Sequence, residues 1–299
     1  MQCSLRLHKR FTTPYIASVP VVCVGNITMG GAGKTPVAIA LAEYFTARGY
    51  AVHFLSRGYG RQTKGMLRVD NRYHHATDVG DEPLLLSQYA PVWVCTDRVM
   101  AAKAAIADGA TLLLMDDGLQ NFSLHKDLSF LVIDGHYGLG NQCLFPAGPL
   151  REPLPKAAKR VNAAILINED HTHITSLLTP YLSVLRCAIV QNISKPLYDK
   201  KLVAFAGIGY PDKFFTMLTS AGLNLIETVA FPDHYPYTTE DINTLFAKAS
   251  ANNALLVTTE KDAMRFPAAF LPQLHVITIT IKWDDTSRLD ACINAALPG

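Results

Sequence analysis

A short apolar run that breaks into a glycine-rich turn constrains this chain more than any other feature. Residues 20–37 read PVVCVGNITMGGAGKTPV, with valines before the turn and Gly33-Lys34-Thr35 at its end. Backbone N–H groups in such a turn can surround phosphate oxygens, and a following helix adds partial positive charge at its N-terminus. Lys34 would add a full charge and Thr35 a hydroxyl ligand for Mg²⁺. The pattern predicts a phosphate-binding loop between a strand and a helix.

This loop departs from the usual G-x-x-x-x-G-K-[ST] pattern at its first position, where Thr28 stands in place of glycine. The residues expected to bind phosphate are Thr28, Met29, Gly30, Gly31, Ala32, Gly33, Lys34 and Thr35. An ordinary glycine turn is the alternative. The segment 36–49 argues against it, because its apolar spacing and terminal glycine are typical of a capped helix. The loop predicts a bound nucleotide but no particular reaction.

Composition limits the classes of protein that need to be considered. The chain has 299 residues, of which 49% are hydrophobic, enough for an enzyme with two domains. A formal net charge of +2 and the lack of a long basic run argue against a nucleic-acid partner. Six scattered cysteines without a C-x-x-C pair predict reduced, buried thiols. No stretch of about 18 apolar residues occurs, so no membrane span is expected.

Strands and helices are expected to alternate along the chain. The first predicted strands are 20–24, 51–55, 92–95, 111–115, 130–133 and 163–167, with a helix at 98–108. Nearly continuous apolar runs such as 112–115 suit strands covered on both faces, hence a mostly parallel sheet flanked by helices. A second series has strands at 201–206, 225–230, 254–258 and 275–281 and helices at 211–221 and 240–250. We expect an α/β fold, with a P-loop core domain at 1–190 and a smaller α/β domain at 191–299 that closes over the active site.

An acidic pair follows one of the predicted strands. The segment LLLMDDGLQ at 112–120 delivers Asp116 and Asp117 at the strand end. In a P-loop protein a carboxylate at this place can hold Mg²⁺ opposite the Thr35 hydroxyl. A plain Asp-Asp-Gly turn is the alternative. Asp116, directly at the strand end, is the better candidate ligand.

Two further segments carry groups suited to phosphoryl transfer. VGDEP at 79–83 opens a short helix. Asp81 is either an ordinary acidic residue that the helix dipole stabilises, or a carboxylate that orients and deprotonates an attacking hydroxyl. FPDHYPY at 231–237 is a proline-bounded loop that carries His234. A lone histidine in a loop is usually just exposed. If the second domain closes over the first, however, His234 could meet Asp81 across the cleft.

Together these segments resemble the tetraacyldisaccharide 4′-kinase family, the lipid A kinases of Gram-negative bacteria. The matching segments are GNITMGGAGKTP, LSRGYGR, GDEPLLL, DRV, LLMDDGLQ, GLGN, PAGPLREP, PDKFF, FPDHYPYT and VTTEKDAMRF. Each is weak alone, whereas their order and spacing are specific. The resemblance implies that the γ-phosphate of ATP is transferred to the 4′-hydroxyl of tetraacyldisaccharide 1-phosphate, giving lipid IVA, with Mg²⁺ required.

The resemblance also assigns roles to residues. It implies that Asp81 accepts the hydroxyl proton with His234 assisting, while Lys34 offsets charge on the transferring phosphoryl group. The candidate metal ligands are Thr35, Asp116, Asp117 and Glu152. Glu82 is a second-rank candidate for metal or substrate contacts. Arg57, Arg61 and Arg98 could contact phosphate or be ordinary surface arginines. At the end of a second-domain strand, Glu260, Lys261 and Asp262 could contact nucleotide or only brace the hinge.

The family resemblance implies a peripheral position on the cytoplasmic side of the bacterial inner membrane, where the lipid substrate lies. Family members usually carry a longer N-terminal segment, a hydrophobic and basic helix, whereas Lys34 here comes early in the chain. Residues 1–17 form a basic amphipathic lead-in that could contact anionic lipid or simply lead into the first strand. No stable protein partner is predicted. The main alternative is a nucleotide-driven regulatory switch related to the partitioning ATPases, which often have lysine where this loop has Met29; a nucleotide-binding adaptor without catalysis is a third possibility.

Overall fold

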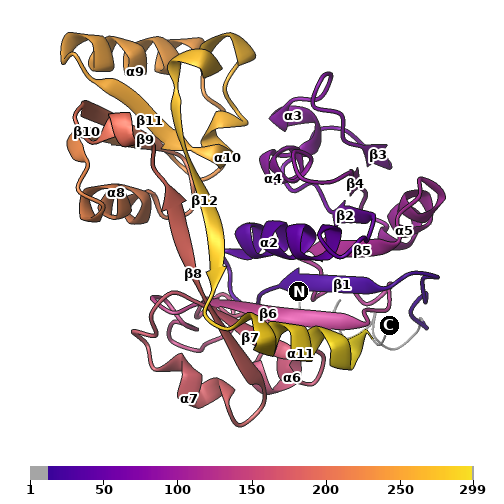
Figure 1. Cartoon of the computed structure of the whole chain (residues 1–299). Helices are drawn as coiled ribbons and strands as arrows, with labels where there is room; N and C mark the ends of the chain where they lie inside the picture. The colour runs from indigo at the N-terminus through magenta and orange to yellow at the C-terminus, as the bar shows by residue number, and fades with distance from the viewer. Residues whose placement is uncertain (1–12, 298–299) are drawn as a thin grey trace.

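The computed structural model describes residues 13–297, which form two lobes (Figure 1). The strands of the first lobe are β1 (Val21–Gly25), β2 (Val52–Ser56), β3 (Leu67–Arg68), β4 (Val92–Val94), β5 (Leu112–Asp116), β6 (Leu128–Asp134) and β7 (Ala163–Ile167). Its helices are α2 (Lys34–Thr46), α3 (Ala76–Val79), α4 (Asp81–Leu86), α5 (Arg98–Ala107), α6 (Leu154–Ala158) and α7 (Ile174–Leu178). The glycine-rich loop that the sequence predicts to bind phosphate joins β1 to α2.

The remaining elements form the second lobe and its connections to the first. The strands are β8 (Ser183–Asn192), β9 (Lys201–Ala206), β10 (Asn224–Ala230), β11 (Leu255–Thr259) and β12 (His275–Trp283). The helices are α8 (Pro211–Ser220), α9 (Thr239–Ala251), α10 (Glu260–Ala263) and α11 (Thr286–Ala296), with 3₁₀ turns η1 (Lys195–Leu197) and η2 (Ala268–Gln273). Thr238 caps α9 by accepting a hydrogen bond from the Asp241 N–H, and the Asp241 carboxylate bonds back to the Thr238 N–H.

One 12-stranded sheet runs through both lobes, in the order β10-β9-β11-β12-β8-β7-β6-β1-β5-β2-β4-β3. β12 pairs antiparallel with β8 and β3 antiparallel with β4, whereas the other pairs in the described residues are parallel. The predicted α/β fold with a mostly parallel sheet is therefore confirmed. Its parallel strands bring their carboxyl ends to one edge, where the loops that carry function gather.

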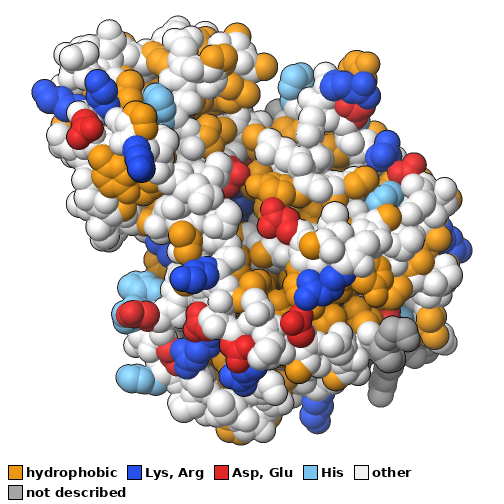
Figure 2. Space-filling model, in the orientation of Figure 1, with side chains coloured by type: hydrophobic (Ala, Val, Ile, Leu, Met, Phe, Trp, Pro, Cys, Tyr) orange, Lys and Arg blue, Asp and Glu red, His pale blue; other side chains and the backbone are white. Residues whose placement is uncertain are grey.

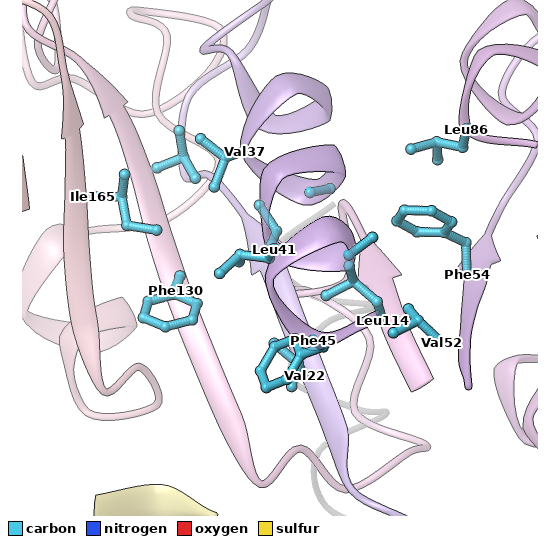
Figure 3. Close-up of a cluster of buried hydrophobic side chains, with 14 of the residues drawn as sticks. Val22, Val37, Leu41, Phe45, Val52, Phe54, Leu86, Leu114, Phe130 and Ile165 are labelled. Atoms are coloured by element: carbon cyan, nitrogen blue, oxygen red, sulfur yellow. The ribbon is translucent and has the colours of Figure 1, made fainter. Parts of the chain in front are cut away.

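The core of the first lobe forms where α2 packs on the sheet (Figure 3). Val37, Leu41 and Phe45 recur every four residues, so they share one face of the helix. That face lies against Val22 of β1 and Phe130 of β6, all at 1% exposure or less. Burying a side chain of this size contributes about 1.5–3 kcal/mol. The helix that follows the phosphate-binding loop is thereby held rigidly on the sheet.

The lobes share strands instead of being joined by a flexible linker. The first part of β12 pairs with β11 of the second lobe, from Val257↔His275 to Thr259↔Ile277. The rest of β12 pairs with β8, whose other side pairs with β7 of the first lobe. α11 then packs on the first lobe, because its Leu289 and Ile293 are buried in the same cluster as α2. The predicted division at residue 190 therefore assigns α11 to the lobe on which it does not pack.

Other expectations are met in part. No helix within residues 13–297 is long and apolar enough to cross a bilayer. Cys23, Cys95 and Cys187 are buried free thiols, as predicted, but Cys143 is exposed. Of the basic lead-in, residues 1–12 lie outside the described part of the chain. Tyr15, within that lead-in, donates its N–H to the Ser123 carbonyl at 2.8 Å.

Candidate active site

The phosphate-binding loop has the backbone geometry that only glycine adopts without strain. Gly30 and Gly33 have φ values of +98° and +79°. A Cβ atom on Gly33 would lie 2.5 Å from Cδ1 of Ile167 on β7. Gly33 therefore lets the loop lie against the sheet and places Lys34 in the first position of α2. The first N–H groups of a helix have no acceptor within the helix, and such a helix start is suited to binding phosphate.

The departure at Thr28 has a structural explanation. The Asn26 side-chain amide donates to Thr28 Oγ1 at 3.1 Å. The residues on either side of Thr28 bond to a distant segment. The Met29 N–H donates to the Pro149 carbonyl at 2.7 Å, and the Ile27 carbonyl accepts from the Arg151 N–H at 2.7 Å. The PAGPLREP segment thus pairs with the start of the loop and supports it. Thr28 lies between the two paired residues, and its hydroxyl accepts the Asn26 bond, which a glycine could not do.

Two acidic residues at the end of β5 have different surroundings. Both Asp117 oxygens lie 3.0 Å from Arg151 Nη1, and Lys34 Nζ lies 3.8 Å from one of them. Asp116 is 3% exposed, and its Oδ1 is buried with no hydrogen-bond partner among the described residues. Burial, together with the negative charge of Glu82, raises the pKa of Asp116 to about 7. A buried carboxylate of this kind favours a cation close to its free oxygen.

Asp81 and His234 meet between the lobes. Asp81 begins α4 in the first lobe and His234 lies in the 231–237 loop of the second, yet His234 Nδ1 is 2.9 Å and 3.0 Å from the two carboxylate oxygens. The bond to Asp81 raises the pKa of His234. Burial opposes ionisation of Asp81, but the bond to His234 and the charge of Lys261 outweigh it and keep the pKa of Asp81 below its ordinary value. The contact therefore favours the charged form of each side chain.

Next to Asp81, Glu82 also has a partner in the second lobe. Lys261 Nζ donates to Glu82 Oε1, and the same oxygen accepts from the Thr35 hydroxyl at 3.4 Å. The Lys261 charge is the main cause that lowers the pKa of Glu82. Burial alone would lower the pKa of Lys261. The negative charges of Glu82 and Asp81 outweigh this effect of burial, so the pKa of Lys261 is raised. Figure 2 shows the surface indented between the lobes that contribute these groups.

Three other candidate residues form hydrogen bonds within the first lobe. Glu152 is 4% exposed, and its Oε1 accepts from Arg160 Nη2 at 2.6 Å and from the Gln120 amide at 3.2 Å. Arg98 is buried and donates to the Ser56 and Cys95 carbonyls. Burial lowers its pKa to about 10. Arg61 donates to the Val94 and Gly65 carbonyls at 3.2 Å and 2.7 Å.

Comparison with known proteins decides the family. The family model described as tetraacyldisaccharide-1-P 4′-kinase matches residues 2–298. The chain belongs to this family. Tetraacyldisaccharide 4′-kinase of Gluconacetobacter diazotrophicus is 48% identical over 91% of this chain and 84% of its own length. The enzyme of the same name from Gluconobacter oxydans is 46% identical over 90% of this chain and 83% of its own length.

A solved structure of the family agrees with the fold. LpxK from Aquifex aeolicus, crystallised as an "apo" form in complex with ATP, has a TM-score of 0.78 to this chain at 26% sequence identity. The match covers 99% of this chain and 93% of that one. The prediction that the chain is a tetraacyldisaccharide 4′-kinase of lipid A biosynthesis is confirmed.

The Asp81–His234 pair predicts a defined pH dependence. Because the pKa of His234 is raised above its unfolded value of about 6.5, the stabilisation that it contributes is complete below that pH and is lost as pH rises through the raised value. The contribution of Asp81, whose pKa is lowered, is present above about pH 3.9 and is lost as pH falls through the lowered value. NMR titration of the His234 imidazole should give a lower midpoint in Asp81→Asn than in the wild type.

A matched control is available on the other ring nitrogen. Asp233 Oδ1 lies 3.8 Å from His234 Nε2, and this carboxylate is half exposed. Asp233→Asn should lower the His234 midpoint by less than Asp81→Asn does. An unchanged midpoint in Asp81→Asn would show that the two side chains do not pair in solution.

Proposed function

We propose that the chain transfers the γ-phosphate of ATP to the 4′-hydroxyl of tetraacyldisaccharide 1-phosphate, with Asp81 as the residue that receives the hydroxyl proton. The observation that carries this proposal is the Asp81–His234 contact at 2.9 Å. The acidic helix start that contains Asp81 also contains Glu82, which contacts Thr35 of the phosphate-binding loop. This contact supports a base located next to the loop that would bind phosphate. The ATP complex of the Aquifex relative supports ATP as the nucleotide.

The reaction follows from this arrangement. The 4′-oxygen forms a bond to the γ-phosphorus, the bond between that phosphorus and the oxygen of the β-phosphate breaks, and ADP leaves. Asp81 orients the hydroxyl and takes its proton. Such transfers have loose transition states that need positioning and charge stabilisation more than a strong base, which suits a carboxylate of low pKa. His234 keeps that carboxylate ionised and fixed in direction.

The phosphate-binding loop supplies the other half of the chemistry. The backbone of residues 28–33 and the Lys34 ammonium would hold the phosphates of ATP. The donor set fits Mg²⁺, because Asp116 at the end of β5 has a carboxylate oxygen without a hydrogen-bond partner and Thr35, in the first turn of α2, is buried. Within residues 13–297 no group of three or more His, Cys, Asp or Glu side chains could hold a metal ion by itself. Mg²⁺ typically binds one or two protein groups plus phosphates and water, and would offset phosphate charge here.

Of the predicted metal ligands, we propose Thr35 and Asp116. Asp117 is already paired with Arg151 and Glu152 with Arg160, so metal binding by these two stays a prediction.

Kinase activity is tested with labelled ATP, Mg²⁺ and tetraacyldisaccharide 1-phosphate. The wild type should form the 4′-phosphate product. Asp81→Asn should lower kcat about 10²–10⁴-fold, the range of general-base losses, with ATP affinity retained. His234→Gln should lower kcat less, since it leaves the carboxylate in place. Asp108→Asn, which removes a surface carboxylate paired with Arg68, is the control and should not change turnover. Full turnover in both Asp81→Asn and His234→Gln would reject the proposed pair.

The metal proposal is tested by the Mg²⁺ requirement. Asp116→Asn should raise the Mg²⁺ concentration needed for half-maximal rate about tenfold or more, because the orphaned oxygen loses its charge. Glu152→Gln, whose wild-type carboxylate is already paired with Arg160, should shift that concentration less. A larger shift in Glu152→Gln than in Asp116→Asn would reverse the assignment. Binding of a fluorescent ATP analogue at graded Mg²⁺ gives the same comparison without turnover.

We propose that the enzyme works peripherally at the cytoplasmic face of the inner membrane, since the acyl chains of its substrate keep that substrate in a bilayer. Residues 1–15 contain basic and apolar residues and lack acidic ones. Such a segment is attracted to anionic lipid.

Sedimentation with anionic vesicles tests the membrane proposal. Binding should weaken at high salt and on deletion of residues 1–15, because salt screens the charges involved. Vesicles of neutral lipid are the control and should bind less. Binding that is unchanged by salt and by the deletion would rule out this electrostatic attachment.

A further inference from the structure

Two consecutive acidic residues at the start of α4 each receive a basic partner from the second lobe. Asp81 contacts His234, and Glu82 contacts Lys261 of α10. Figure 1 shows α10 facing α4 across the boundary between the lobes. The Asp81–His234 pair has a role in the proposed mechanism, whereas Lys261 has none so far. Its position calls for a functional explanation of its own.

Lys261 is placed by rigid structure. It lies in α10, two residues after the end of β11, and β11 pairs with β9 on one side and β12 on the other. Thr259 caps the α10 turn by accepting from the Asp262 N–H at 3.2 Å. Asp262 is fully buried and accepts from the Gly207 N–H at 2.8 Å. The backbone that carries Lys261 is therefore fixed, and the side chain projects from the second lobe onto Glu82 with 28% of its surface exposed.

The ammonium lies next to the phosphate-binding loop. The Glu82 oxygen that accepts from Lys261 also accepts from the Thr35 hydroxyl, and Thr35 follows Lys34 directly. One carboxylate oxygen thus separates the Lys261 ammonium from the loop that would hold the phosphates of ATP. A lysine here is a compact charge on a flexible stem, which can move between neighbouring anions.

We propose that Lys261 is a catalytic lysine supplied by the second lobe, and that it contacts the terminal phosphate of the bound nucleotide. In the structure described here, Glu82 holds its ammonium beside Thr35. A γ-phosphate carries more negative charge than one carboxylate and draws the ammonium away from Glu82. This inference rests on the proposed kinase function.

Lys261 would act on charge and not on protons. As the bond to the 4′-oxygen forms and the bond to the β-phosphate oxygen breaks, the hydroxyl proton passes to Asp81 and negative charge builds on the departing β-phosphate. The Lys261 ammonium keeps its protons and stabilises the oxygens of the moving phosphoryl group, opposite Lys34. Because His234 and Lys261 both belong to the second lobe, closure of the lobes would bring the proton-accepting pair and this cation together.

The competing explanation is that Lys261 only braces the two lobes. The chain offers a matched control for that role. Lys213 of α8 in the second lobe forms an ion pair with the buried Asp134 of β6 in the first. This pair also connects the lobes, but Asp134 is not part of the acidic helix start at 81–82. A brace should affect all nucleotides alike, whereas a contact with the terminal phosphate should affect ATP and not ADP.

Binding of ATP and ADP to the full chain distinguishes the two roles. In Lys261→Met, ATP affinity should fall about tenfold or more, as for loss of a charged hydrogen bond, and ADP affinity should change less than about twofold. The kcat for lipid phosphorylation should fall about 10²–10³-fold, and Lys261→Arg should recover part of it. Lys213→Met should change ATP and ADP affinity by the same factor. Equal changes for both nucleotides in Lys261→Met, or no change, would overturn the proposal.

Two additions keep the result interpretable. Removing Lys261 leaves Glu82 without its partner, so the double variant Lys261→Met/Glu82→Gln is measured as well. This variant should bind ADP as the wild type does and should show the same selective loss of ATP affinity. The comparison of ATP with ADP needs no lipid acceptor. A wild type that phosphorylates no tetraacyldisaccharide would therefore refute the proposed function, while the nucleotide comparison would still decide the role of Lys261.

Discussion

The antiparallel pairing of β8 with β12 is the constraint on which the site depends. It extends from Thr278↔Asn192 to Trp283↔Cys187, and β12 continues from it into the second lobe. Because the two lobes share this ladder, they cannot separate without breaking backbone hydrogen bonds. Bending and twisting of the shared strands is the motion that remains. The shared strands therefore keep the loop that carries His234 and the turn that carries Lys261 on the side of the first lobe where α4 begins.

Electrostatics gives this arrangement its function. The first lobe gathers the carboxylates of Asp81, Glu82 and Asp116 around the phosphate-binding loop, where burial makes each negative charge costly. The second lobe supplies the compensating charges of His234 and Lys261. The Asp116 oxygen without a hydrogen-bond partner is a point at which this balance is incomplete, and we propose it as the place where a cation accompanying ATP would bind.

Much of the fold could be predicted because its signals are local. Buried parallel strands have continuous apolar runs, and α2 has apolar residues at helical spacing, so these elements begin and end close to the predicted residues. The candidate site was predicted in outline, since Asp81 and His234 were expected to meet only if the lobes closed. The support of the loop by residues 149–151 was not predicted, because a backbone pairing between distant segments leaves no mark on residue type.

By itself, the sequence determined the strand, loop and helix around Lys34, the α/β class and the family, since each depends on neighbouring residues or on the order of motifs. The tertiary structure alone decided where α11 packs, which of Asp116, Asp117 and Glu152 has a free oxygen, and which residue faces Glu82. Glu82 and Lys261 are 179 positions apart. Their contact follows from the path of β8 and β12, and ion pairs at such separations depend on how the chain folds back on itself and not on any local pattern.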